Sequence, residues 1–263
     1  MTNILNGEAL DGFRVDIDPA RERGDIILDR PPLNIISLVQ RDQLRRVFEE
    51  LDADKSVRVI VLRSEGTHFS SGGNIRGFLD ATPETLLKLA VNIAAPARCT
   101  KPVIAANRGY CFGVGFELSL ACDFRLISET CVYSLPEQKL GQIPGSGGSA
   151  RLQRMVGITR AKNLLMRSKR IEAAEAIALG IATECVKDDL LGSATDGLVD
   201  ELRAFSPLAQ RTLKQLINEG EELPLADAIE REGQYYGRLR MSDDYREGIL
   251  AFGEKRPPRF NGT

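Results

Sequence analysis

Histidine is almost absent from this 263-residue sequence, in which His68 is the only one. A Ser-His-Asp or Cys-His catalytic system needs a histidine beside its nucleophile, and zinc sites commonly use several. Because the pattern gives this one imidazole no partner, we interpret His68 as a loop histidine without a chemical role. Acid–base chemistry then falls to carboxylates, and we expect no metal and no redox cofactor.

Long apolar runs and closely paired cysteines are missing as well. No stretch approaches the about 18 apolar residues that span a bilayer, and residues 1–14 lack a basic segment followed by an apolar one. The five cysteines are scattered, which is typical of reduced thiols, so we expect a cytoplasmic location. The formal net charge of -2 favours neither nucleic acid nor a membrane surface as a partner, so local groups must hold any anionic ligand.

Short apolar runs alternate with helical patterns over the first two-thirds of the chain. This alternation predicts an α/β core, and the hydrophobic share of 43% is enough to fill one. We expect strands at 25–28, 57–63, 103–106 and 124–128. We expect helices at 38–52, 83–98 and 116–121.

The last quarter of the chain carries helical patterns only. We expect helices at 191–204, 207–219, 224–239 and 243–252. The chain is therefore divided into an α/β core with the active site (1–190) and a helical C-terminal region (191–263). Helices with wide apolar stripes and no sheet of their own must cover another surface. The pattern leaves open whether that surface belongs to the same chain or to a neighbouring subunit.

Two glycine-containing turns follow predicted strands. The run Gly109-Tyr-Cys-Phe-Gly-Val-Gly-Phe-Glu117 leads into an apolar helix, whose first N–H groups are free to meet a ligand. The run Phe69-Ser-Ser-Gly-Gly-Asn74 can bring another backbone N–H to the same ligand. Two such donors suit a carbonyl oxygen that gains negative charge. Taken alone, either turn is explained by the need for glycine in a tight backbone turn.

Two glutamates stand in unusual settings. Glu117 lies among apolar residues such as Phe116 and Leu118, and burial of an unpaired carboxylate is costly. Glu137 follows Pro136 in a segment whose backbone the prolines make rigid. The alternatives are that Glu117 pairs with a core arginine and that Glu137 is an exposed loop charge.

The segment from Lys101 to Asp123 contains the first of these turns and Glu117. Together with Pro136-Glu137 and Pro144-Gly-Ser-Gly-Gly148, it resembles the signature of the enoyl-CoA hydratase/isomerase (crotonase) superfamily. The similarity extends to Arg30-Pro-Pro-Leu-Asn34 and to the tail near residues 247–256. It implies a crotonase-like α/β spiral of ββα units. It also implies a helical C-terminal oligomerisation region that forms a homotrimer or a dimer of trimers.

The resemblance also assigns roles to particular residues. Glu117 and Glu137, twenty positions apart, become the catalytic pair. The backbone N–H groups of Gly73 and Val114 form the oxyanion hole for a thioester carbonyl. Because both glutamates are present, addition or removal of water is favoured over double-bond migration. The implied protein is an enoyl-CoA hydratase-type lyase that needs no cofactor beyond the coenzyme A of its acyl-CoA substrate.

For the coenzyme A portion, the resemblance implies contacts from Ser71 and Gly73, with Phe252 and Lys255 reaching it from a neighbouring subunit. Lys255 would pair with a phosphate of coenzyme A. From the sequence alone, a solvated lysine and a packing phenylalanine are the alternative.

Two residues depart from the family pattern at positions expected near the substrate. Val114 stands where the family usually has glycine, so its isopropyl group must fit beside the thioester or point away. Asn74 replaces an aspartate found in many relatives. The sequence does not specify the acyl group, whose pocket we expect to include residues 78–90.

Other functions stay open at this point. The same scaffold supports enoyl-CoA isomerases, dienoyl-CoA hydratases and thioester hydrolases or lyases. A non-catalytic binding or assembly protein is the alternative of another class, although the intact glutamates argue against it.

Overall fold

The computed structural model describes residues 7–79 and 81–263. The first six residues of the predicted core and position 80 of the expected pocket segment lie outside the described residues. The main sheet has the strand order β1-β2-β3-β4-β6-β9, in which β1 is antiparallel to β2 and the other neighbours are parallel. Its strands are β1 (Phe13–Asp18), β2 (Arg23–Leu28), β3 (Val59–Ser64), β4 (Val103–Asn107), β6 (Phe124–Ser128) and β9 (Glu184–Val186).

A second, smaller sheet pairs three short strands in the order β5-β7-β8. These are β5 (Tyr110–Phe112), β7 (Val132–Ser134) and β8 (Ile171–Glu172). β5 leads through Gly113 into α4 (Val114–Leu120), and η3 (Glu137–Leu140) follows β7 closely along the chain. The small sheet thus fixes the backbone before both predicted catalytic glutamates.

The main sheet separates two apolar layers. Alternate residues of β3 point to opposite faces, so that Ile60 and Leu62 join one core cluster while Val59 and Val61 join the other. Strands buried on both faces are typical of parallel sheets covered by helices on both sides. The predicted α/β core is confirmed.

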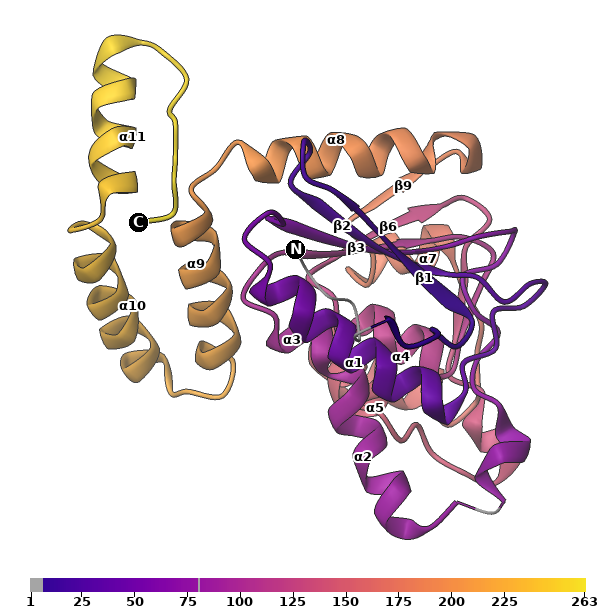
Figure 1. Cartoon of the computed structure of the whole chain (residues 1–263). Coiled ribbons are helices and arrows are strands. Elements are labelled where there is room, and N and C mark those ends of the chain that lie inside the picture. The colour runs from indigo at the N-terminus through magenta and orange to yellow at the C-terminus, as the bar shows by residue number, and fades with distance from the viewer. Residues whose placement is uncertain (1–6, 80) are drawn as a thin grey trace.

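Helices cover the face of the main sheet on which the glutamates lie (Figure 1). The elements there are α1 (Leu38–Ala53), α2 (Pro83–Ile93), α3 (Ala95–Arg98), α4, α5 (Gly148–Val156), α6 (Ile158–Leu165) and α7 (Ala173–Ala178). α1 begins at a capping box, in which the Ser37 hydroxyl accepts from the Gln40 N–H and the Gln40 side chain accepts from the Ser37 N–H. Its buried stripe includes Leu44, Phe48 and Leu51.

One predicted helix is divided. The expected helix at 83–98 consists of α2 and α3, which meet at Ala94. Pro96 has no N–H to continue the hydrogen-bond ladder of α2, and its ring obstructs the preceding turn. The prediction of a single helix was therefore wrong.

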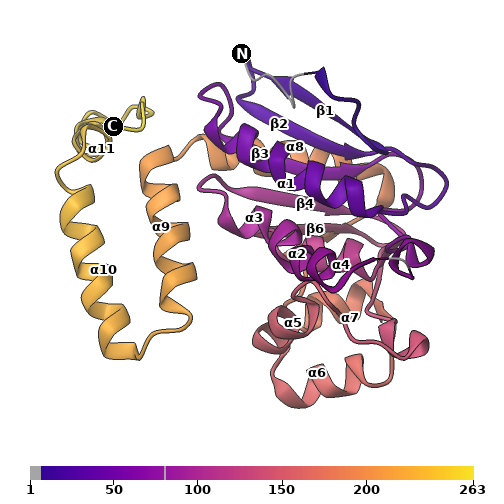
Figure 2. The ribbon, with the colours of Figure 1, turned by 60° about the horizontal axis from the view of Figure 1, so that its bottom comes forward.

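The C-terminal helices behave in two ways. α8 (Leu191–Arg203) lies across the outer face of the main sheet and buries Leu191, Val199 and Leu202 against it (Figure 1). α9 (Pro207–Gly220), α10 (Leu225–Leu239) and α11 (Asp243–Glu254) form an arm that extends away from the core (Figures 1 and 2). The predicted helical C-terminal region is present, while its boundary at 190/191 and its role in oligomerisation stay predictions.

The arm exposes many large apolar side chains. They are Leu213, Ile217, Leu225, Ile229, Tyr236, Met241, Tyr245, Ile249, Leu250 and Phe252.

Within the described ranges, no helix is both long and apolar enough to cross a membrane.

Candidate active site

The two predicted glycine turns lie side by side. The Ser70 N–H donates to the Tyr110 carbonyl at 2.8 Å, and the Phe112 N–H donates to the Ser70 carbonyl at 2.9 Å. These bonds join the loop at 69–74 to the segment that leads into α4. As a result, a β-carbon added at Gly73 would lie 3.6 Å from Val114 Cγ1.

Gly73 and Val114 each present a free backbone amide. Val114 is the first residue of α4, where an N–H has no acceptor within the helix. Neither this N–H nor that of Gly73 donates to another residue in the described part of the chain. Two neighbouring free donors are the arrangement that stabilises a developing oxyanion.

The two departures from the family pattern have different consequences. The Val114 side chain is buried in the core cluster and faces the α-carbon of Gly73, so it forms part of the wall and leaves its own N–H available. Asn74 is exposed, and its N–H donates to the Ile36 carbonyl at 3.0 Å. This position therefore contributes backbone structure to the loop.

Glu117 is buried one turn into α4, with 3% of its surface exposed. Its Oε1 accepts from the backbone N–H of Ser146 at 2.7 Å and from that of Gly148 at 3.0 Å. These donors come from the segment before α5, so the Pro144–Gly148 motif holds the carboxylate in place. The Glu117 hydrogen bonds go to backbone amides and not to a core arginine.

Glu137 is the first residue of η3 and is half-buried. Its Oε1 lies 3.2 Å from where a β-carbon at Gly113 would stand, and its Oε2 is buried without a hydrogen-bond partner in the described structure. Burial raises the pKa of this carboxyl to about 7, and the negative charge of Glu117 contributes to the rise. A carboxyl with this pKa exchanges a proton near neutral pH, which an exposed loop charge does not do.

Arg41, on α1, is a residue of this site that sequence reasoning missed. Its side chain is buried, and its guanidinium lies over the Phe78 ring, 5.2 Å from the centroid. Its Nη2 is 2.6 Å from where a β-carbon at Gly73 would stand. Burial lowers the pKa of Arg41 to about 10, while Glu117 and Glu137 oppose the decrease.

The sequence did contain a signal for Arg41. It precedes Leu44, Phe48 and Leu51 at helical spacing on the buried stripe of α1. A charged residue on an apolar stripe is the same anomaly that singled out Glu117.

The predicted coenzyme A residues do not all meet in one chain. Ser71 lies in the loop beside Gly73, and its N–H donates to the Leu33 carbonyl at 2.8 Å. Phe252 and Lys255 are exposed at the end of α11, which lies across the molecule from α4 (Figure 1). Contribution from a neighbouring subunit is still a prediction.

His68 has a packing role near the same loop. Its Nδ1 accepts from the Tyr110 N–H at 3.1 Å, and its ring stacks on that of Tyr110 with centroids 4.3 Å apart. Within the described ranges, no group of three or more His, Cys, Asp and Glu side chains is placed to hold a metal ion.

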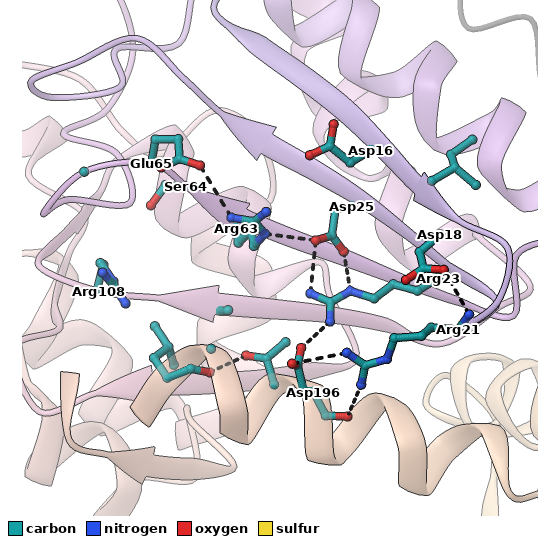
Figure 3. A pocket seen from close by; sticks show the side chains of 16 residues that line it. Asp16, Asp18, Arg21, Arg23, Asp25, Arg63, Ser64, Glu65, Arg108 and Asp196 are labelled. Carbon is teal, nitrogen blue, oxygen red and sulfur yellow. Dashed lines mark hydrogen bonds and ion pairs between the residues drawn. The ribbon is translucent and has the colours of Figure 1, made fainter. Parts of the chain in front are cut away.

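A cavity of about 490 Å³ between α8 and the sheet is a second candidate (Figure 3). Its arginines are already paired: Arg23 contacts Asp25 and Asp196, Arg63 contacts Asp25, Arg21 contacts Asp196, and Arg108 contacts Asp188. Arg23 and Asp25 are buried, and Asp196 of α8 satisfies a further donor of Arg23, so this network compensates charges that would otherwise be buried unpaired. We therefore assign it a structural role.

The spiral core and the site around α4 define a class of protein. Glu117 stands on the helix that begins with the free Val114 amide, and Glu137 Oε1 lies beside Gly113. Two carboxylates in different environments near a pair of free backbone amides are the arrangement of a crotonase-type acid–base catalyst.

Comparison with known proteins agrees with this class. The sequence profile of the enoyl-CoA hydratase/isomerase family matches residues 24–263. A probable enoyl-CoA hydratase of Rhizobium meliloti is 35% identical over 240 residues, which cover 90% of this chain and 93% of that protein. A carnitinyl-CoA dehydratase of Proteus mirabilis is 35% identical over 246 residues, with coverages of 90% and 94%. The chain belongs to the enoyl-CoA hydratase/isomerase family.

Solved structures show the same fold. The crystal structure of an enoyl-CoA hydratase from Bacillus anthracis superposes with a TM-score of 0.90 at 31% identity, covering 96% of this chain and all of the other. The predicted superfamily and fold are confirmed.

Proposed function

We propose that the protein is an enoyl-CoA hydratase-type lyase, which adds water reversibly across the α,β double bond of an acyl-CoA thioester. The observation that carries this proposal is the pairing of buried Glu117 with Glu137 beside the free amides of Gly73 and Val114. The names of the relatives, a hydratase and a dehydratase, support water as the group added or removed.

In the proposed mechanism, the N–H groups of Gly73 and Val114 donate to the thioester oxygen. They stabilise the negative charge that develops there, so the β-carbon becomes electrophilic. Glu117 accepts a proton from the attacking water, whose oxygen bonds to the β-carbon. Glu137 donates its proton to the α-carbon, and the two carboxyls then exchange protons with solvent before the next turnover.

No further cofactor enters this mechanism, since coenzyme A is part of the substrate. Ser71 and the amide of Gly73 would contact it from the loop of the same chain. Phe252 and Lys255 would contact it from a neighbouring subunit.

Hydration of crotonyl-CoA, followed by loss of the conjugated thioester absorbance, tests the proposal. We expect formation of the 3-hydroxy thioester. Release of free thiol would indicate a hydrolase, and double-bond migration in a 3-enoyl ester without hydration would indicate an isomerase. Binding of several CoA esters without turnover of any would favour the non-catalytic alternative.

The pH dependence of kcat/KM should be the same in both directions of the reaction, because hydration neither takes up nor releases a net proton. Hydration requires protonated Glu137, so its kcat/KM should fall above about pH 7, where this carboxyl loses its proton. Dehydration starts from the enzyme form with the same number of protons, in which Glu117 is protonated and Glu137 is ionised, so its kcat/KM should fall over the same range. Measurement of kcat/KM from about pH 5.5 to about pH 9, on both sides of the pKa of Glu137, checks this pH dependence. Two flat profiles would contradict the role of Glu137.

We also propose that the chain assembles as a homotrimer or a dimer of trimers through the arm of α9 to α11. The exposed apolar side chains of the arm support this, because they lack cover within the described part of the chain. Light scattering should give three or six times the 28.9 kDa of one chain. A monomeric mass would contradict both the assembly and the contribution of Lys255 to a neighbouring site.

A further inference from the structure

The guanidinium of Arg41 is buried without an ionic partner. Only 3% of the residue is exposed, and Nε has no hydrogen-bond acceptor. Among the described residues, none of its nitrogens lies within ion-pair distance of a carboxylate. Burial of a charge without a partner is costly, so a protein that keeps one has a use for it.

The position of this guanidinium relates it to the acyl group. It lies against the α-carbon of Gly73, whose N–H points to the thioester oxygen in the proposed mechanism, and over the ring of Phe78. Phe78 begins the segment that we expect to line the acyl pocket. An acyl chain bound with its carbonyl at the Gly73 amide would therefore pass close to Arg41.

Two arginines lie near the catalytic glutamates. Arg41 and Arg151 are both within electrostatic range of Glu117. Arg151 donates to the Ser146 carbonyl at 3.3 Å, behind the loop that holds Glu117. Of these two arginines, Arg41 is thus the one available to a ligand.

We propose that Arg41 determines specificity by pairing with a carboxylate on the acyl group, so that the substrates are mono-CoA thioesters of α,β-unsaturated dicarboxylic acids. This inference rests on the proposed hydratase function and deepens it. The planar guanidinium offers a fork of N–H donors that matches two carboxylate oxygens. Such a pair would satisfy Nε and neutralise the buried charge.

The test compares esters that differ only at the end of the acyl chain. Wild-type kcat/KM is measured for the mono-CoA thioester of glutaconic acid and for its homologue with one more methylene. Matched esters carry an isopropyl or an acetyl group in place of the carboxylate. We expect the better carboxylate ester to exceed its isopropyl match by on the order of 100-fold, the value of a hydrogen-bonded charged pair. Equal turnover of the isopropyl match would overturn the proposal, and equal turnover of the acetyl match would show that charge is not recognised.

Variants assign the preference to Arg41. Arg41→Met should reduce the ratio of carboxylate to isopropyl ester to about one, and Arg41→Lys, which keeps the charge without the fork, should give an intermediate ratio. Arg45→Met is the matched control on the same helix, because Arg45 pairs with Asp42 and Glu49 near the surface. Its ratio should equal that of wild type. An unchanged ratio in Arg41→Met would refute the role of Arg41.

A binding measurement separates this proposal from the hydratase proposal. Calorimetry with the wild-type protein compares glutaryl-CoA with the saturated ester that ends in isopropyl. Tighter binding of glutaryl-CoA by on the order of 100-fold supports Arg41 even when no enoyl ester is hydrated, in which case the hydratase proposal alone fails. Equal affinities contradict the carboxylate site whatever the reaction is, and this result does not depend on the folding of any variant.

Discussion

Replacement of Glu117 with glutamine should lower kcat for hydration of crotonyl-CoA by about 1,000-fold, because glutamine cannot accept the proton of the attacking water. The substitution keeps the shape of the side chain. Its amide oxygen can still accept from the N–H groups of Ser146 and Gly148, which hold Glu117 Oε1 in the native protein. The loss should therefore appear in the chemical step, with little change in the affinity for a saturated acyl-CoA.

The measurement is kcat by the absorbance assay. Calorimetry gives the affinity for butyryl-CoA, and thermal unfolding gives the stability of each variant. Glu129→Gln, at an exposed position in the turn after β6, is the matched control and should keep wild-type kcat. If Glu117→Gln retained kcat within about tenfold of wild type, Glu117 would not be the general base and the two-carboxylate mechanism would be wrong. A loss of folded protein would instead be visible in the unfolding curve.

The prominence of Glu117 in the sequence has a physical explanation. A carboxylate among apolar residues on a helix must have a compensating partner, so its position alone marks it as unusual. The partner is not visible in the same way, since Ser146 and Gly148 contribute backbone N–H groups about thirty positions later. Only the family resemblance connected that glycine-rich segment to Glu117 before the structure did.

The fold was predictable where periodicity extends over many residues. The positions of α1, β3 and α8 to α11 follow from apolar spacing, which packing then satisfies. The strands of the small sheet have two or three residues each, too few to show a period. The strand predicted at 25–28 misses the start of β2, where Arg23 and Asp25 are charged. Those two charges are buried as an ion pair with α8, a contact that no local pattern indicates.

Arg41 shows how far the candidate site could be predicted from the sequence. Its place on the apolar stripe of α1 was visible, but its meaning depends on the loop that carries Gly73 and on Phe78, which approach it only in the folded chain. An arginine on such a stripe is often a core ion pair. The structure provides no such partner in the described residues, and this result makes the residue a candidate for substrate recognition.

Substitution of Gly113 is the second change from which we expect a large loss of activity. Its backbone has φ 52° and ψ -128°, a combination that side chains with a β-carbon rarely adopt. An alanine there would place its β-carbon 3.2 Å from Glu137 Oε1 and 3.6 Å from Gly72 Cα. Relief of this strain requires rotation of the peptide that contains the Val114 N–H, together with displacement of Glu137.

Gly113→Ala should therefore lower kcat by on the order of 100- to 1,000-fold, the cost of losing one donor of an oxyanion hole. Two hydrogen bonds fix Gly113: its N–H donates to the Ser134 carbonyl, and its carbonyl accepts from the Glu117 N–H. These bonds oppose a compensating movement of α4. The helix start cannot shift without breaking one of them. The loss of stability should be about 1–3 kcal/mol.

Gly157→Ala separates the two consequences, strain and misplacement of the donor. Gly157 has φ 82° and ψ 158° before α6, also unfavourable for alanine, and an added β-carbon would meet no atom within 4 Å. We expect a comparable decrease in the free energy of unfolding with kcat near that of wild type, both measured on the same samples. Equal losses of kcat in the two variants would mean that general destabilisation explains the effect at Gly113. A selective loss in Gly113→Ala would tie catalysis to the position of the Val114 amide and Glu137, because those are the groups that an alanine at Gly113 displaces and an alanine at Gly157 does not.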